Sequence, residues 1–143
     1  MRISLKFLVF ATRSVGKNNM PKKILFIEDE SALQKNLSDL FSQEGYETIS
    51  ALDGEIGLSL AKNKKPDLIL LDLILPKASG FDVLKNLKED KDAKNIPVIV
   101  LTNLESMGDI EKALALGATT YLVKSSYSLD EILEKVKKTL GDL

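Results

Sequence analysis

Apolar residues gather in short runs along the chain, and most of these runs end in a polar or charged side chain. Runs this short and this apolar predict strands that are buried on both faces of a parallel sheet. One further run has more polar residues and predicts a less buried strand. The expected strands cover residues 24–27, 46–51, 68–71, 98–101 and 120–123.

Between the strands, apolar residues recur every three or four positions, which predicts amphipathic helices. Capping boxes at 31–34 and 128–131 predict where the first and the last helix begin. The second helix should carry Ile56, Leu60 and Ala61 on its apolar face. The helices are expected at about 31–44, from a cap at Asp53 to Lys65, after Gly80, at 104–116 and at 129–140.

Regular alternation of strand and helix predicts an α/β fold. Right-handed crossovers would place helices on both faces of a five-stranded parallel sheet. The simplest arrangement is a doubly wound, flavodoxin-like sheet in the order 2-1-3-4-5.

Composition favours a single compact domain, expected at residues 21–143, because a chain of 143 residues with 44% hydrophobic residues buries one core of ordinary size. A net charge of -1 provides no basic field for nucleic acid, so direct DNA or RNA binding is not expected. The absence of cysteine and histidine excludes disulfides, thiolate or imidazole metal ligands, and a phosphohistidine.

Residues 1–20 differ from the rest of the chain. The apolar stretch 3–11 is interrupted by Lys6 and is shorter than the roughly 20 residues that a membrane-spanning helix needs. No small-residue cleavage site follows it. A flexible leader or an upstream start codon is the favoured interpretation, because a chain starting at Met20 would begin directly at the first strand. A cytoplasmic protein without a membrane anchor is expected.

Polar side chains follow the predicted strands at one edge of the sheet. Residues 28–30, Glu-Asp-Glu, follow the first strand, Asp72 the third, Thr102 the fourth and Lys124 the fifth. Each residue alone has an ordinary structural explanation, such as a solvated turn or a helix cap. Together they predict a site, because ligands of open parallel sheets bind at the carboxyl ends of the strands.

Clustered carboxylates suit phosphoryl transfer to one of them. Glu28, Asp29 and Asp72 would raise one another's pKa unless a hard divalent cation kept them ionised, which predicts Mg²⁺. Asp72 would be the nucleophile. Lys124 and the Thr102 hydroxyl would bind the remaining phosphoryl oxygens.

With these residues in place, the chain from about Pro21 to Leu143 resembles a response regulator receiver domain, as in the single-domain chemotaxis and sporulation regulators of two-component systems. Four segments in the right order carry the resemblance. They are Ile24-Leu25-Phe26-Ile27-Glu28-Asp29-Glu30, Leu70-Leu71-Asp72-Leu73-Ile74-Leu75-Pro76, Leu101-Thr102 and Tyr121-Leu122-Val123-Lys124.

The resemblance implies that Asp72 accepts a phosphoryl group from a histidine kinase or a histidine phosphotransfer protein. It implies that Asp29, Asp72 and the main-chain carbonyl of Ile74 bind Mg²⁺ directly, and that Glu28 acts through a metal-bound water. Lys124 would contact the phosphoryl group. The chain would catalyse only its own phosphorylation and dephosphorylation, and would otherwise be no enzyme.

The resemblance also implies a switch made of Thr102 and Tyr121. Phosphorylation would draw Thr102 inward, and the Tyr121 ring would follow from an exposed to a buried position. A downstream protein would then bind the face formed by the 105–116 helix, the last strand and the last helix.

Some residues depart from the family pattern. Asn103 replaces the usual small residue and could crowd the pocket, while Ser125 replaces a proline that usually follows the lysine in a cis peptide bond. The residues two beyond the acceptor and two beyond the switch hydroxyl, Ile74 and Leu104, are apolar. In receivers these positions line the path of the hydrolytic water, which predicts a long-lived phosphoaspartate.

Other classes of protein fit less well. A haloacid dehalogenase-type phosphohydrolase would need an acid at Ile74, and a flavodoxin-like nucleotide binder would need a glycine- or hydroxyl-rich loop where residues 28–30 are acidic. A receiver that acts as a passive docking module without phosphorylation remains an alternative.

Overall fold

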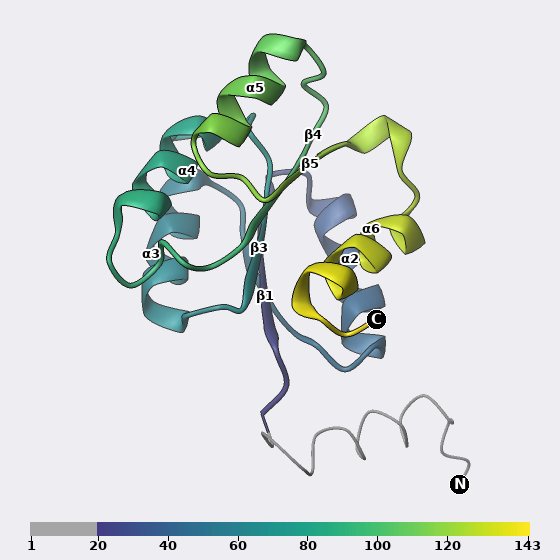
Figure 1. The fold of residues 1–143 in the computed structure, drawn as a ribbon. Coiled ribbons are helices and arrows are strands. Elements are labelled where there is room, and N and C mark those ends of the chain that lie inside the picture. The colour runs from purple at the N-terminus through teal and green to yellow at the C-terminus, as the bar shows by residue number, and fades with distance from the viewer. Residues whose placement is uncertain (1–19) are drawn as a thin grey trace, which may run out of the picture.

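The computed structural model describes residues 20–143, so the predicted leader lies outside the described residues except for Met20. Across these residues, five strands form one parallel sheet in the order β2-β1-β3-β4-β5, which confirms the predicted fold class (Figure 1). Ile27 lies beside Ala51 on one side and Leu71 on the other, so these carboxyl ends are level. The strands are β1 (Lys23–Ile27), β2 (Glu47–Ala51), β3 (Leu68–Leu71), β4 (Val98–Thr102) and β5 (Thr120–Val123).

Helices cover both faces of this sheet. In Figure 1, α3, α4 and α5 lie on one face and α2 and α6 on the other, as right-handed crossovers require. None of the helices within residues 20–143 is long and apolar enough to cross a membrane. The helices are α2 (Ser31–Gln43), α3 (Gly54–Lys64), α4 (Gly80–Glu89), α5 (Met107–Ala115) and α6 (Leu129–Leu140), and the 3-10 turn η1 (Lys124–Ser126) follows β5.

The core lies in two layers, one on each face of the sheet. Leu25 and Ile27 of β1 pack in the layer that contains residues of α3, α4 and α5, and Phe26 packs in the layer of α2 and α6. The Phe26 ring meets Phe41 of α2 edge to face, with 5.4 Å between the ring centroids. Burying one such side chain contributes about 1.5–3 kcal/mol to the stability of the fold. The core therefore holds the sheet in place, together with the edge from which the loops leave it.

The helix predicted from residue 104 begins later, at Met107. Ser106 caps it, because its hydroxyl accepts a hydrogen bond from the Asp109 amide at 3.2 Å. Residues 104–106 therefore stay outside the helix, and the backbone of Leu104 is available to other partners.

The capping box predicted at the start of α2 is wrong, whereas the one at α6 is confirmed. Glu30, not Ser31, occupies the N-cap position, and its side chain makes no capping bond. At α6 the Ser128 hydroxyl accepts from the Glu131 amide, and the Glu131 carboxylate accepts from the Ser128 amide. Gln34, expected in the first box, points into the protein instead.

The apolar face predicted for α3 is partly wrong. Ile56 is 49% exposed, and the buried positions of the helix are Gly54, Gly57 and Ala61. A Cβ atom at Gly57 would lie 2.7 Å from the Ile27 side chain, so only glycine lets the helix approach the sheet this closely.

Gly80 allows α4 to start directly against the exit of β3. A Cβ atom there would lie 2.3 Å from the Cα of Leu73 and 2.4 Å from the carbonyl oxygen of Asp72. Both neighbours are backbone atoms, so any side chain at this position would displace them. The helix and the backbone at Asp72 are therefore held in close contact.

Asp142 fastens the end of α6 to the amino-terminal edge of the sheet. Its carboxylate accepts hydrogen bonds from Lys22 Nζ and from the Tyr46 hydroxyl, both at 2.8 Å. We expect Asp142→Ala to lower the free energy of unfolding by about 1–2 kcal/mol, measured by urea denaturation, because it removes both contacts. Asp39→Ala, which removes an exposed ion pair with Lys35, is the control and should cost no more than about 0.5 kcal/mol. Equal losses in the two variants would contradict this assignment.

Candidate functional site

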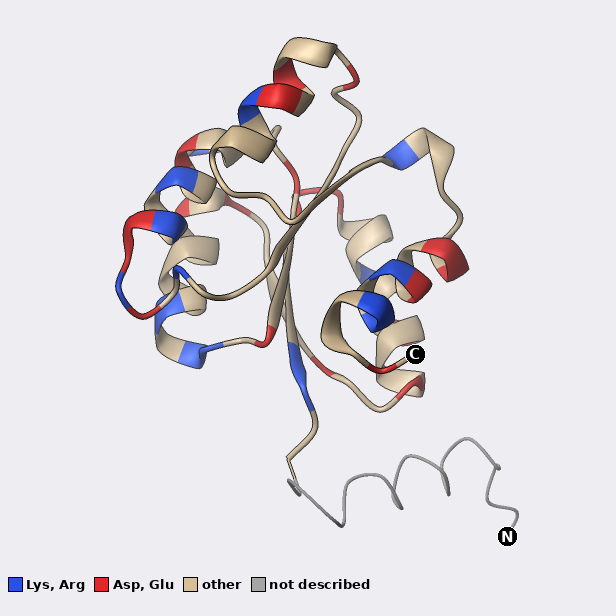
Figure 2. Cartoon of the chain, in the orientation of Figure 1, with Lys and Arg blue, Asp and Glu red and all other residues tan. Residues whose placement is uncertain are grey.

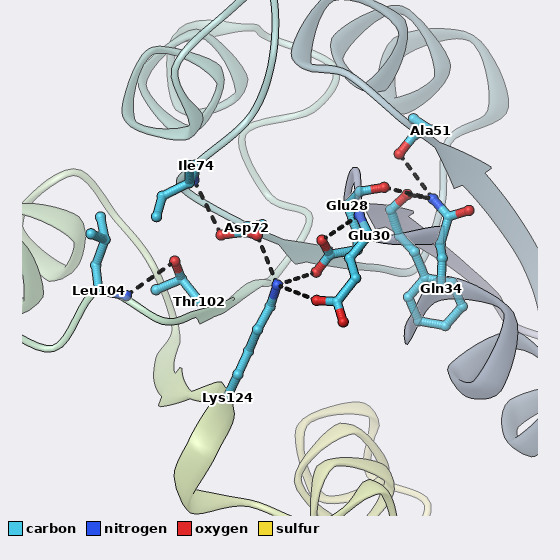
Figure 3. Close-up of polar contacts among 10 residues, drawn as sticks. Glu28, Glu30, Gln34, Ala51, Asp72, Ile74, Thr102, Leu104 and Lys124 are labelled. Atoms are coloured by element: carbon cyan, nitrogen blue, oxygen red, sulfur yellow. Dashed lines mark hydrogen bonds and ion pairs between the residues drawn. The ribbon is translucent and has the colours of Figure 1, made fainter. Parts of the chain in front are cut away.

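Asp72 lies just beyond β3, at the carboxyl edge of the sheet. Its amide continues the sheet by donating to the carbonyl oxygen of Ile27 at 2.9 Å, which fixes the backbone. Its Oδ1 accepts a hydrogen bond from the Ile74 amide at 3.1 Å (Figure 3). The carboxylate is almost fully buried, so it needs a charged partner.

The two acids that follow β1 stand next to Asp72. Carboxylate oxygens of Glu28, Asp29 and Asp72 all lie within 4.8 Å of one another. Glu28 and Asp72 are buried and Asp29 is exposed, so the cluster opens to solvent on one side. A hard divalent cation suits such a set, because Mg²⁺ prefers a few carboxylates together with other oxygen ligands.

Lys124, which follows β5, reaches into this cluster. Its ammonium lies 2.7 Å from Glu28 Oε1 and 2.9 Å from Asp72 Oδ2, with Glu30 Oε2 farther away at 3.6 Å (Figure 3). Figure 2 shows acidic and basic positions around the upper end of the sheet. The contact with Glu30 was not predicted from the sequence.

Glu28 and Lys124 both have pKa values shifted from their ordinary range. Burial raises the pKa of Glu28, and its hydrogen bonds with Lys124 and the Glu30 amide only partly oppose this. Burial alone would lower the pKa of Lys124, but its hydrogen bonds to Glu28 and Asp72 outweigh burial, and the pKa is raised. The raised pKa of Lys124 shows that the neighbouring carboxylates stabilise a positive charge at this position.

Thr102 and Tyr121 meet at the backbone of Leu104. Thr102 is fully buried at the end of β4, and its hydroxyl accepts a long hydrogen bond of 3.5 Å from the Leu104 amide. The Tyr121 hydroxyl donates to the Leu104 carbonyl oxygen at 2.7 Å. Burial raises the pKa of Tyr121, and the charges of Asp109 and Asp72 add to it. The Tyr121 ring is half-buried.

The residues that depart from the receiver pattern lie at the surface of the protein. Asn103 and Ser125 are both exposed. All peptide bonds in residues 20–143 are trans, including the one between Lys124 and Ser125. Ile74 is 55% exposed near Asp72, and Leu104 is partly buried.

Gln34 is a residue of the site that the sequence did not reveal. It is buried, and its amide nitrogen donates to the carbonyl oxygens of Glu28 at 3.2 Å and Ala51 at 2.9 Å, with Phe26 at the limit of 3.5 Å (Figure 3). The signal that could have found it is a polar residue at an inward-facing position of a helix, between Leu33 and Leu37.

Known proteins resemble this chain over nearly all of the described residues. A family model for the response regulator receiver domain matches residues 24–137. The polar-differentiation response regulator DivK of Brucella anthropi is 40% identical over 123 residues, which cover 86% of this chain and 99% of that protein.

Solved structures of receivers share the fold. A CheY-like receiver domain protein from Methanospirillum hungatei superposes with a TM-score of 0.80 at 27% identity, over 86% of this chain and 96% of that one. The receiver domain of the sensor histidine kinase PA1611 from Pseudomonas aeruginosa, with a magnesium ion coordinated in its active site cleft, gives a TM-score of 0.77 at 25% identity, over 85% and 99% of the two chains.

Proposed function

The chain belongs to the response regulator receiver family of two-component systems, and we propose that it accepts a phosphoryl group on Asp72 and signals through a phosphorylation-dependent protein contact. Receivers of this family interact with histidine kinases and with downstream targets. The observation that carries the proposal is the buried Asp72 carboxylate, which lies within 4.8 Å of two further acids and 2.9 Å from the Lys124 ammonium.

Asp72 is the acceptor in this proposal. A carboxylate oxygen of Asp72 attacks the phosphorus of a phosphohistidine on a histidine kinase or a histidine phosphotransfer protein. The new P–O bond forms as the P–N bond breaks, and the electron pair of that bond returns to the imidazole nitrogen. An ionised carboxylate needs no general base, which agrees with a chain that contains no histidine.

The donor set fits Mg²⁺. Asp29, Asp72 and the main-chain carbonyl of Ile74 would hold the ion directly, and Glu28 would do so through a water molecule. Bound there, Mg²⁺ would neutralise negative charge on the phosphoryl oxygens. Two findings support this, namely the three-acid cluster and the magnesium ion in the Pseudomonas receiver of the same fold.

Lys124 and Thr102 would contact the transferred group. Lys124 already donates to Asp72, so its ammonium lies where oxygens bonded to that carboxylate would arrive. The Thr102 hydroxyl holds the Leu104 amide only by a long bond of 3.5 Å, so little is lost when it turns to a phosphoryl oxygen.

The face formed by α5, β5 and α6 would transmit the signal to a downstream protein. Met107 and Leu114 of α5 are exposed to 70% and 46%, which gives this face apolar contact area for a partner. Tyr121 of β5 is tied to Leu104 in the loop before α5, so a shift of that loop on phosphorylation would reach the same face. We propose that a downstream protein binds there.

NMR shifts should report this coupling. On addition of beryllofluoride and Mg²⁺, which mimic the aspartyl phosphate, we expect shift changes to extend from Asp72 to α5, β5 and α6. In Thr102→Ala they should stay near the pocket, because the hydroxyl that links Asp72 to the Leu104 loop is missing. We expect a graded preference for partners, since such coupling is typically about 1–3 kcal/mol.

Ser106→Ala is a control for general loosening of α5, because it removes the helix cap without touching the pocket. It should keep the long-range shift changes. If the wild type itself shows changes only around Asp72, the passive docking module becomes the better interpretation.

The remaining expectations are part of the same proposal. Residues 21–143 form the receiver domain, located in the cytoplasm, and the chain catalyses only its own phosphorylation and dephosphorylation. It contacts neither nucleic acid nor membrane directly. The phosphohydrolase alternative is disfavoured because that class needs an acid two residues after the nucleophile, and this position is Ile74.

A further inference from the structure

Gln34 is a buried polar residue on a helix face that otherwise packs in the core. It is 8% exposed, and Leu37 and Phe41, farther along the same helix, lie in the core layer between α2 and the sheet. An amide in such surroundings costs free energy unless its polar atoms are bonded. The Gln34 side-chain nitrogen is hydrogen-bonded to the Ala51 carbonyl oxygen at the end of the sheet, and it takes no part in capping its own helix.

The partners of Gln34 are backbone carbonyls at the point where two strands end. The Ala51 carbonyl oxygen, at the end of β2, receives both the Gln34 amide at 2.9 Å and the Glu28 backbone amide at 3.0 Å. The Glu28 carbonyl oxygen receives the Gln34 amide at 3.2 Å. Both backbone polar groups of Glu28 are therefore held, although Glu28 lies beyond the last residue of β1.

Fixing this backbone also fixes the carboxylates that it carries. The Glu28 side chain leaves the held residue toward Lys124 and the Glu30 amide, and Asp29 is the next residue along the chain. Movement of the β1 end by a fraction of an ångström would change the spacing of both acids relative to Asp72. The Asp72 backbone is held from the other strand, because its amide donates a hydrogen bond to the carbonyl oxygen of Ile27, the last residue of β1.

From these contacts we infer that Gln34 is a positioning residue for the cation site, holding the end of β1 so that Glu28 and Asp29 face Asp72 at the spacing that Mg²⁺ requires. The role rests on the metal site of the proposed function. It adds a residue that touches neither metal nor phosphoryl group and acts through the Glu28 backbone. Residues that orient metal ligands in this way commonly contribute about 10- to 100-fold in metal affinity.

The test is Mg²⁺ binding to the full chain, measured by NMR titration with MgCl₂ in the absence of any phosphodonor. Gln34→Met keeps a similar side-chain volume and removes the donor, and we expect about tenfold weaker Mg²⁺ binding. Gln34→Asn keeps the amide but is one methylene shorter, and serves if the methionine variant does not fold. At saturating Mg²⁺ the initial rate of phosphorylation by acetyl phosphate should stay within about twofold of wild type, because the reacting groups are intact.

Two controls separate positioning from loss of stability. Gln43→Met makes the same change at an exposed position of the same helix and should bind Mg²⁺ like wild type. Leu37→Val loosens the core near Gln34 without touching Glu28 and should also leave Mg²⁺ affinity unchanged in the folded protein.

The possible outcomes are distinct. The inference is overturned if a folded Gln34 variant binds Mg²⁺ as tightly as wild type, if Leu37→Val weakens binding equally, or if neither Gln34 variant folds. If the wild type binds no Mg²⁺, the proposed metal site itself fails and this role fails with it. Wild-type binding with unchanged affinity in the variants would reject only the role of Gln34.

Discussion

Asp72→Asn should show no phosphoryl adduct in the intact mass spectrum after incubation with acetyl phosphate and Mg²⁺, whereas the wild type should gain one phosphoryl group. The asparagine keeps the shape of the side chain but removes the nucleophilic carboxylate. Omitting Mg²⁺, or adding EDTA, should suppress the wild-type adduct as well. Without the ion, the Lys124 ammonium would face three carboxylates alone and could not also compensate the negative charge of the incoming phosphoryl group.

Asp67→Asn provides the matched control. Asp67 precedes β3 just as Asp72 follows it, and its carboxylate accepts from the Lys23 amide at the opposite edge of the sheet. This variant should be phosphorylated like the wild type. An adduct that persists in Asp72→Asn would remove Asp72 as the acceptor.

The second large effect should be on the lifetime of the phosphoaspartate. We expect Ile74→Asn combined with Leu104→Glu to speed its hydrolysis about tenfold, which corresponds to about 1.4 kcal/mol in the barrier. In the wild type both side chains are apolar, and Ile74 is 55% exposed beside the acceptor, so a water molecule there has few polar partners. Decay of the adduct, followed by mass spectrometry after removal of the phosphodonor, measures the effect.

Ile56→Asn controls for a polar group added elsewhere on the same edge, since Ile56 is 49% exposed on the first turn of α3. Its adduct should decay at the wild-type rate. Unchanged decay in the double variant would refute the assignment of Ile74 and Leu104 to the water path.

The fold was predictable because its main signals are local. Residues 24–27, 68–71 and 98–101, which form most of β1, β3 and β4, are all apolar, and strands buried on both faces require this pattern. Once the strands were known to be parallel, the polar residues at their ends had to share one edge. The sequence therefore predicts that Glu28, Asp72 and Lys124 lie together, and in the structure Lys124 contacts both acids.

The features that the sequence does not predict correctly are those for which partners far away in the sequence compete with local ones. Ser31 and Gln34 have the spacing of a capping box, but three backbone carbonyls at the ends of β1 and β2 attract the Gln34 amide instead. Ile56 has the spacing of a core residue, but the glycine after it is the residue that meets the sheet. The start of α5 was predicted early because apolar spacing continued through Leu104, while the cap that decides the start is Ser106.

The close contact at Gly80 limits how this site can vary. Ile74, Asn103 and Ser125 are exposed next to site residues, so their side chains can change without moving the backbone of Asp72. At Gly80, by contrast, the addition of a single methyl group would collide with the Asp72 carbonyl oxygen. We therefore expect substitutions at these exposed positions to change the chemical rates of the domain without disturbing its fold, whereas position 80, packed against the Asp72 backbone, has room only for glycine.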